Sequence, residues 1–167
     1  LPAGEGLVGF WTRRPIGVVV GITGFNYPLL LAAHKIAPAV AAGCPVIVKP
    51  APATPLATLW LVHLLRESGA LPNAAVQLVT GDVEVGRTLV EDRRIGAVSF
   101  TGSAAAGHII ARNAAPTKVL LELGSNAALV VAADADLEAA ADAVVRGGYY
   151  ASGQACISVQ RVLVEGP

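Results

Sequence analysis

Continuous apolar runs alternate with longer Ala- and Leu-rich segments along most of the chain, and this alternation limits the folds that it can adopt. A run that is apolar throughout, rather than at every second residue, is typical of a strand buried on both faces. Strands are therefore predicted over residues 17–22, 45–49, 75–79, 97–100 and 119–123. The segments between them predict helices over residues 27–43, 53–69, 82–92 and 103–114. Strand and helix alternating four times indicate an α/β fold: an open parallel sheet with helices on both faces.

The ends of the first two predicted helices carry residues that start and stop helices. Pro28 is expected in the first turn of one helix, and Gly43 after its last turn. Thr54 is the expected N-cap of the next helix, with Pro55 in its first turn and Gly69 as its stop.

The texture of the sequence changes after Gly124. Three further elements are predicted there, a strand over 126–131, a helix over 134–152 and a strand over 158–166. Asp134 or Asp136 is the expected cap of the helix. We therefore expect a first domain over residues 1–124 and the start of a second α/β domain over residues 125–167.

The composition narrows the partners that such a fold could have. Lys and Arg together number 12, as do Asp and Glu, and there is no basic run to follow a phosphate backbone, so no nucleic acid partner is expected. Residues 15–33 carry no charge, but Gly, Asn and Pro interrupt them, so we expect no membrane span. Hydrophobic residues make up 54% of the chain and charged residues only 14%, which indicates apolar surface covered by further protein. The two cysteines form no disulfide framework and favour a reducing cytoplasm.

Polar or glycine-rich segments follow each predicted strand, where open parallel sheets bind their ligands. Gly102 and Ser103 open a helix and could bind a phosphate, although Gly-Ser also serves as a simple helix cap. Lys49 ends an apolar strand, where it either meets an anion or a ribose or extends to solvent. Glu122 is either a solvated charge or a base whose pKa is raised by apolar surroundings.

Asparagine, cysteine and histidine are the other residue types with possible roles in catalysis or metal binding. Asn26, between two aromatic residues, is either a turn residue or an amide donor to a developing oxyanion. Cys156, on a Gly-Gln-x-Cys turn, has the setting of a nucleophile, whereas Cys44 before a buried strand is expected to be a small apolar filler. The three histidines lack metal-ligand spacing, so no metal site is expected.

Five motifs in order, "GFNYPL", "KPAPATP", "SFTGS", "LELGS" and "GQACISVQRV", resemble the NAD(P)-dependent aldehyde dehydrogenase superfamily over essentially the whole chain. The resemblance implies a Rossmann-like cofactor domain followed by the first part of a catalytic domain. It also implies oxidation of a small aldehyde to a carboxylic acid, with Cys156 as nucleophile, Asn26 and the Cys156 backbone N–H as oxyanion hole, and Glu122 as the base that activates hydrolytic water.

For the cofactor, NAD or NADP, the resemblance implies a set of binding residues at the strand ends: Thr23, Lys49, Gly81, Gly86, Phe100, Gly102, Ser103 and Leu123. NAD-preferring members have a glutamate three residues after the lysine, where this chain has Pro52. Without that carboxylate a 2′-phosphate meets no repulsion there, so we expect NADP to be tolerated or preferred.

Two alternatives remain open at this point. One is a relative that passes the acyl group to coenzyme A, against which Glu122 argues, and the other is a nucleotide-binding homologue without catalysis. The resemblance further implies a homodimer or homotetramer for the full-length protein, and little turnover by these 167 residues alone.

Overall fold

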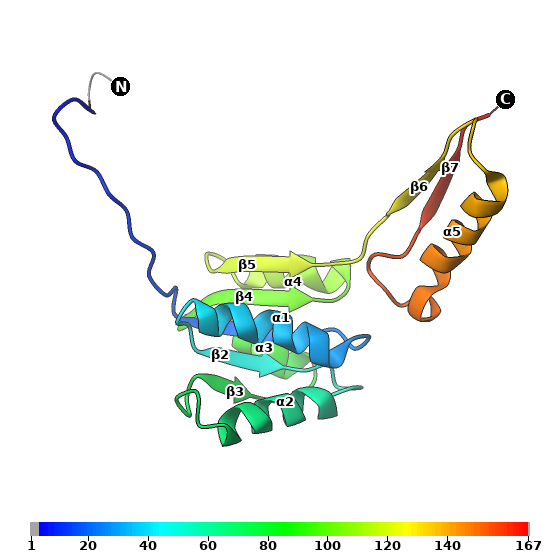
Figure 1. Cartoon of the computed structure of the whole chain (residues 1–167). Coiled ribbons are helices and arrows are strands. Elements are labelled where there is room, and N and C mark those ends of the chain that lie inside the picture. The colour runs from blue at the N-terminus through cyan, green and yellow to red at the C-terminus, as the bar shows by residue number, and fades with distance from the viewer. Residues whose placement is uncertain (1–3, 167) are drawn as a thin grey trace.

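The computed structural model describes residues 4–166 and contains one five-stranded parallel sheet. Its strands lie in the order β3-β2-β1-β4-β5, so β1 is central (Figure 1). Their bounds are Val18–Ile22 for β1, Val46–Lys49 for β2, Val76–Leu78 for β3, Ile95–Thr101 for β4 and Lys118–Glu122 for β5. The predicted parallel sheet is confirmed, because every neighbouring pair of these strands is parallel.

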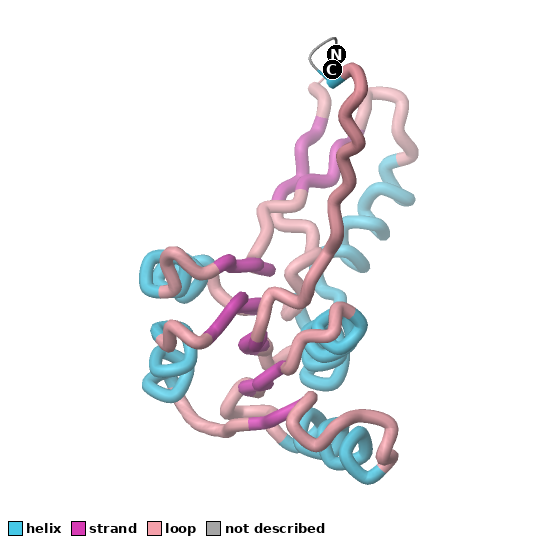
Figure 2. The backbone as a smooth tube through the Cα atoms, turned by 90° about the vertical axis from the view of Figure 1, so that its left-hand side faces the viewer, coloured by secondary structure: helices cyan, strands magenta, loops and turns pink. Residues whose placement is uncertain are grey.

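Two pairs of helices cover the two faces of the sheet, as Figure 2 shows with the strands seen between helical layers. On one face, α1 (Pro28–Ala41) packs on β1 and β2, and α2 (Leu56–Glu67) packs on β3. On the other face, α3 (Val83–Glu91) packs on β1 and β4, and α4 (Ala104–Asn113) packs on β5. The chain therefore changes face after β3, and the strand order reverses at β1, which is where doubly wound sheets bind ligands.

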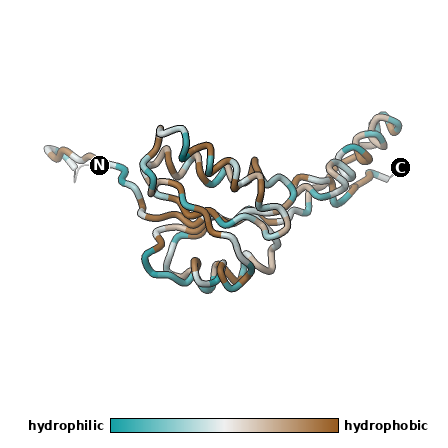
Figure 3. The backbone as a smooth tube through the Cα atoms, turned by 90° about the horizontal axis from the view of Figure 1, so that it is seen from below, coloured by the Kyte–Doolittle hydropathy of each residue, from teal (hydrophilic) through white to brown (hydrophobic). Residues whose placement is uncertain are grey.

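Each face of the sheet has its own hydrophobic core. Val46 and Val48 pack with α1 and α2 residues on one face, whereas Val20 and Val98 pack with α3 and α4 residues on the other. All four side chains are fully buried. Figure 3 shows the corresponding band of hydrophobic residues along the central strands. Burial on both faces explains why these strands are continuous apolar runs in the sequence.

Most of the predicted helix signals are in place, but the predicted cap of α2 is wrong. Pro28 is the first residue of α1, and Gly43 and Gly69 follow α1 and α2 with positive φ angles of 72° and 64°. The N-cap of α2 is Pro55 rather than Thr54. The Thr54 hydroxyl instead donates to the carbonyl of Phe25 at 3.2 Å, which ties the start of α2 to the loop after β1.

Residues after β5 form a second, smaller unit. Strands β6 (Ala128–Val131) and β7 (Arg161–Val164) pair in parallel as a sheet of their own, and α5 (Leu137–Tyr149) connects them. Asp136, one of the two predicted caps, accepts hydrogen bonds from the backbone N–H groups of Glu138 and Ala139. Within residues 4–166, no helix is long and apolar enough to cross a membrane.

Candidate active site

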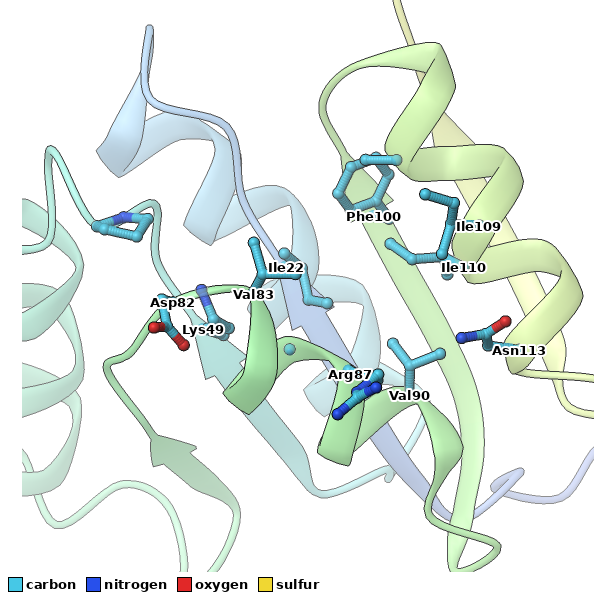
Figure 4. Close-up of a pocket in the computed structure, with 13 residues that line it drawn as sticks. Ile22, Lys49, Asp82, Val83, Arg87, Val90, Phe100, Ile109, Ile110 and Asn113 are labelled. Atoms are coloured by element: carbon cyan, nitrogen blue, oxygen red, sulfur yellow. The ribbon is translucent and has the colours of Figure 1, made fainter.

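A cavity of about 240 Å³ opens between α3 and α4 at the carboxyl ends of the central strands (Figure 4). Three residues in register across the sheet contribute to its lining: Lys49 on β2, Ile22 on β1 and Phe100 on β4. Side chains in register on parallel strands point to the same face, here the face that α3 and α4 cover. The remaining wall is largely apolar, with Ile109 and Ile110 supplied by α4. Such a slot suits a flat heterocycle.

Lys49 is the buried cation of this cavity, with only 5% of its surface exposed. Burial lowers the pKa of its ammonium group, and the negative charge of nearby Asp82 partly opposes that effect. Within residues 4–166 its side chain has no hydrogen bond or ion pair that would satisfy the charge. A Cβ atom added at Gly86 would lie 3.7 Å from Cδ and Cε of Lys49, so α3 passes close beside the lysine stem. An ammonium group in this position is available to an anionic or polar ligand.

Gly102, Ser103 and Leu123 lie at the carboxyl ends of β4 and β5 without lining the cavity. A Cβ atom at Gly102 would lie 2.5 Å from Cζ of Phe100, so a larger residue here would force that ring to shift. The Ser103 hydroxyl accepts a hydrogen bond from the N–H of Ala106 at 3.3 Å and thus caps α4. Leu123 packs against Gly107 in α4, where a Cβ would be 2.5 Å from Cδ2 of Leu123.

The other two predicted cofactor positions are also at strand ends outside the cavity lining. Thr23, directly after β1, is buried, and its hydroxyl has no hydrogen-bond partner in residues 4–166. Gly81 precedes α3 with a φ of 148°, a conformation that side chains rarely adopt, and an added Cβ would clash with Val85. Of the eight predicted cofactor residues, only Lys49, Gly86 and Phe100 line the cavity.

Asn26 meets the loop that carries Cys156. It lies in the turn between β1 and α1, and its side-chain Nδ2 donates to the carbonyl of Gln154 at 2.5 Å. Cys156 is exposed, while Ala155 and Ser158 on either side of it are buried. The turn leading into this loop is strained, because Ala151 and Ser152 have φ angles of 50° and 59°. Two residues 128 positions apart in the sequence, Asn26 and Gln154, are thus in contact at the carboxyl end of the sheet.

Two tyrosines accompany this pair. The Tyr27 hydroxyl is buried and makes no hydrogen bond of standard geometry within residues 4–166. The nearby Tyr150 hydroxyl nevertheless raises the pKa of Tyr27. Burial and the thiol group of Cys156 shift this pKa in the same direction. Sequence reasoning missed both tyrosines as neighbours of the cysteine, although Tyr27 adjoins Asn26.

Glu122 lies on the opposite face of the sheet from the cavity. It is exposed at the end of β5 and in register with Thr101 on β4. The Thr101 hydroxyl accepts a 2.7 Å hydrogen bond from Nζ of Lys35, which is buried in α1. Burial lowers the pKa of Lys35, while the charge of Glu122 opposes the shift. The Glu122 carboxylate is thus open to solvent within residues 4–166.

Cys44 and the three histidines do not line the cavity. Cys44 is buried, as expected for a small apolar filler. The histidines at 34, 63 and 108 are exposed on helices, and residues 4–166 contain no group of three or more His, Cys, Asp or Glu side chains placed to bind a metal ion.

Comparison with known proteins decides the family. The sequence profile of the aldehyde dehydrogenase family matches residues 1–167. This chain belongs to that family. Among curated aldehyde dehydrogenases, it is 44% identical over 163 residues to aspartate-semialdehyde dehydrogenase 1 of Pseudomonas canavaninivorans, covering 98% of this chain and 34% of the relative. It is also 44% identical over 164 residues to 3-sulfolactaldehyde dehydrogenase of Priestia aryabhattai, covering 98% and 34%. The chain thus spans about a third of the length of the curated relatives.

Solved aldehyde dehydrogenase structures have the same fold over this region. Glyceraldehyde-3-phosphate dehydrogenase from Methanocaldococcus jannaschii, complexed with NADP, superposes with a TM-score of 0.87 at 39% identity, covering 92% of this chain and 35% of its own. Betaine aldehyde dehydrogenase from Staphylococcus aureus, in complex with NAD+, also gives 0.87 at 41% identity, covering 91% and 30%. The five-stranded sheet is therefore the Rossmann-like sheet of aldehyde dehydrogenases.

Asp82 and Arg87 line the cavity but were not singled out in the sequence of this aldehyde dehydrogenase chain. The signal available for Asp82 is its place directly after Gly81 at the end of a strand. An aspartate before a helix has an ordinary role as an N-cap, which Asp82 fulfils, so the sequence offers no reason to place it beside Lys49.

Proposed function

We propose that the protein to which this chain belongs oxidises a small aldehyde to a carboxylic acid with NAD+ or NADP+, using Cys156 as nucleophile. The observation that carries the proposal is the contact between the Asn26 amide and the carbonyl of Gln154, two residues before Cys156. It brings an amide donor and a thiol to the edge of the sheet at which the cavity opens. A nucleophile with a donor for the developing negative charge is the minimum that addition to a carbonyl needs.

The proposed chemistry uses these side chains in two stages. The Cys156 thiolate attacks the aldehyde carbon, and the negative charge on oxygen is held by the Cys156 backbone N–H and the second N–H of Asn26, whose first N–H is bonded to Gln154. Loss of a hydride from the thiohemiacetal carbon, for which NAD+ or NADP+ supplies the acceptor, leaves a thioester on Cys156. Glu122 takes a proton from water, which hydrolyses the thioester to the acid and restores the thiol.

The cavity between α3 and α4 fits the adenosine half of a dinucleotide. Lys49 is buried there without a hydrogen-bond partner in residues 4–166, so the ribose hydroxyls or a phosphate could bind it, and the apolar wall from α4 would take the adenine. We assign the other strand-end residues to the remainder of the cofactor: Thr23, Gly81, Gly86, Phe100, Gly102, Ser103 and Leu123. Pro52 lines the cavity and brings no carboxylate, which supports tolerance of, or preference for, NADP.

The proposal extends to the organisation of the protein. Residues 1–124 would be the cofactor domain and residues 125–167 the beginning of the catalytic domain of a homodimer or homotetramer. A free thiol as nucleophile suits the reducing cytoplasm, where we place the enzyme. Because the chain spans about a third of its relatives, we propose that these 167 residues alone turn over little.

The test is an assay of NAD(P)H formation from small aldehydes by the full-length enzyme that carries these residues. Cys156→Ala should abolish turnover, and Asn26→Ala should lower kcat by roughly 10²- to 10³-fold. Glu122→Gln should give a single burst of NAD(P)H, because the thioester then accumulates. Turnover retained by Cys156→Ala would contradict the mechanism, and turnover only with added coenzyme A would favour an acyl-transferring relative.

Labelling of the thiols provides a check on the 167-residue chain itself. Iodoacetamide should modify the exposed Cys156 far faster than the buried Cys44. Equal rates would count against an activated cysteine and favour a homologue that binds nucleotide without catalysis.

A further inference from the structure

Asp82 is the one acidic residue among the described residues that line the cavity between α3 and α4. It stands at the N-terminus of α3, and its Oδ1 accepts a hydrogen bond from the N–H of Glu84 at 3.1 Å. Figure 4 shows its carboxylate next to Lys49 at one end of the cavity, with Arg87 and Asn113 towards the other end. The two charges interact, since Asp82 opposes the effect of burial on Lys49.

A capping role alone accounts for one oxygen of Asp82 and leaves its place beside Lys49 without a function. Lys49 is more than nine-tenths buried, lines the same cavity and has no hydrogen-bond partner in residues 4–166. Asp82 is near enough for its charge to act on Lys49, yet the two form no ion pair, so both retain hydrogen-bonding capacity towards a bound ligand. The combination of an ammonium and a carboxylate suits a ligand that both donates and accepts hydrogen bonds, such as a pair of vicinal hydroxyls.

Because residue 52 is a proline, the Asp82 carboxylate determines the negative charge beside Lys49. Pro52 also lines the cavity and presents no charge, so Asp82 is the remaining source of negative potential beside Lys49. A ribose with free hydroxyls can donate to Asp82 and accept from Lys49. A ribose that carries a 2′-phosphate pairs with Lys49 but places its negative charge near a carboxylate, which lowers its affinity.

We propose that Asp82 is the residue by which this chain discriminates between NAD and NADP: it accepts a hydrogen bond from the adenosine ribose and limits the binding of a 2′-phosphate. The inference rests on the proposed cofactor site. Pro52 allows NADP to bind, and the charge of Asp82 limits how tightly it binds. Removing that charge should therefore shift the selectivity further towards NADP.

Calorimetric titration of the 167-residue chain with two fragments tests the proposal without requiring turnover. The fragments are 5′-AMP and adenosine 2′,5′-bisphosphate, which differ only in the 2′-phosphate. Asp82→Asn removes the charge and preserves the cap, because Asn caps helices as well as Asp does. We expect the ratio of bisphosphate affinity to AMP affinity to rise on the order of tenfold in Asp82→Asn. Asp82→Ser, a second capping residue without charge, should shift the ratio in the same direction.

Asp92→Asn is the matched control, since it removes the same charge at the other end of α3 from a residue that does not line the cavity. In Asp92→Asn the ratio of bisphosphate affinity to AMP affinity should change by less than about twofold, because the lost charge is distant from the cavity and screened by solvent. Suppose that the wild-type chain binds both fragments and that Asp82→Asn changes the ratio of bisphosphate affinity to AMP affinity by less than twofold. This result would overturn the role of Asp82 but leave the proposed cofactor site unaffected. A wild-type chain that binds neither fragment would overturn the cofactor site itself, and the role of Asp82 with it.

Discussion

The two sheets of the chain bury their hydrophobic residues to very different degrees. The five-stranded sheet has a completed core on each face, with Val20, Val46, Val48 and Val98 fully buried. In the smaller unit, α5 has no buried residue, and all four residues of β7 are exposed. The difference follows what covers each sheet, because helices lie on both faces of the five-stranded sheet, whereas α5 alone accompanies the β6-β7 pair.

The contrast explains the composition of the chain. A strand covered by helices on both faces can be apolar throughout, as β1 and β4 are. The β6-β7 pair is apolar as well, yet the residues of β7 on both faces are exposed within residues 4–166, and Leu163 is half exposed. Apolar surface of this kind normally packs against further protein. The candidate active site lies where the completed unit and the uncovered unit meet, at the Asn26 to Gln154 hydrogen bond.

The largest expected difference between the two units is the loss of stability when one valine in each is truncated to alanine. Val98→Ala removes two methyl groups from a fully buried site in β4 and should lower the free energy of unfolding by about 2–3 kcal/mol. Val164→Ala makes the same change in β7, where the side chain is 65% exposed, and should cost less than about 0.5 kcal/mol. Urea unfolding measures both. Equal losses would mean that β7 is covered in solution, for example by a second copy of the chain.

The next largest effect is expected at the N-cap of α5, because this helix has no buried residues that stabilise it. Asp136→Ala removes the acceptor of two backbone hydrogen bonds, at 3.0 and 3.1 Å, and should destabilise α5 by about 1 kcal/mol. Hydrogen exchange of the α5 amides measures the loss, which corresponds to roughly fivefold faster exchange. Asp134→Ala is the control, since its side chain makes no hydrogen bond within residues 4–166. The same acceleration in both variants would exclude a capping effect.

The fold could be predicted from the sequence because its signals are local. Each buried strand is a continuous apolar run, and each helix that connects two strands is bounded by proline, glycine or a capping residue. The cap of α2 shows where local signals stop. Thr54 has the identity of an N-cap, but its hydroxyl donates instead to Phe25, 29 residues earlier, and that partner depends on how the loop after β1 packs.

The candidate site was predictable only in part, for a related reason. Lys49 was conspicuous as a charge at the end of an apolar strand, and the structure places it in the cavity. Asp82 was inconspicuous, because an aspartate at the start of a helix has a local explanation. Its position beside Lys49 arises from the parallel pairing of β2 and β3, which brings the two strand ends together. Neither residue alone carries that information.

The hydrogen bond between the units should have a smaller effect than the cap. Asn26→Ala removes the 2.5 Å bond to Gln154, and a typical net loss for one partly exposed bond is about 0.5–1 kcal/mol. We expect roughly two- to fivefold faster amide exchange over residues 154–158, with the central strands unchanged. Asn113→Ala is the matched control, because Asn113 bonds Glu91 within the first unit and should leave residues 154–158 unaffected. Unchanged exchange in Asn26→Ala would show that the two units are held together by other contacts.

The smallest effect is electrostatic and belongs to the completed unit. Arg94 hydrogen-bonds Asp92 through its guanidinium and its backbone N–H, and this lowers the pKa of Asp92 to about 2. Since the unfolded chain has an aspartate pKa of about 4, the pair stabilises the fold above about pH 4 and loses that contribution as the pH falls towards 2. Asp92→Asn should therefore flatten the dependence of the urea midpoint on pH in this window. Arg94→Gln should flatten it too, because Asp92 then titrates nearer its ordinary pKa. The Arg94 side chain is 88% exposed and that of Asp92 27% exposed, so added salt should weaken the effect in the wild type. A slope unchanged in both variants would assign the acid sensitivity to other carboxylates.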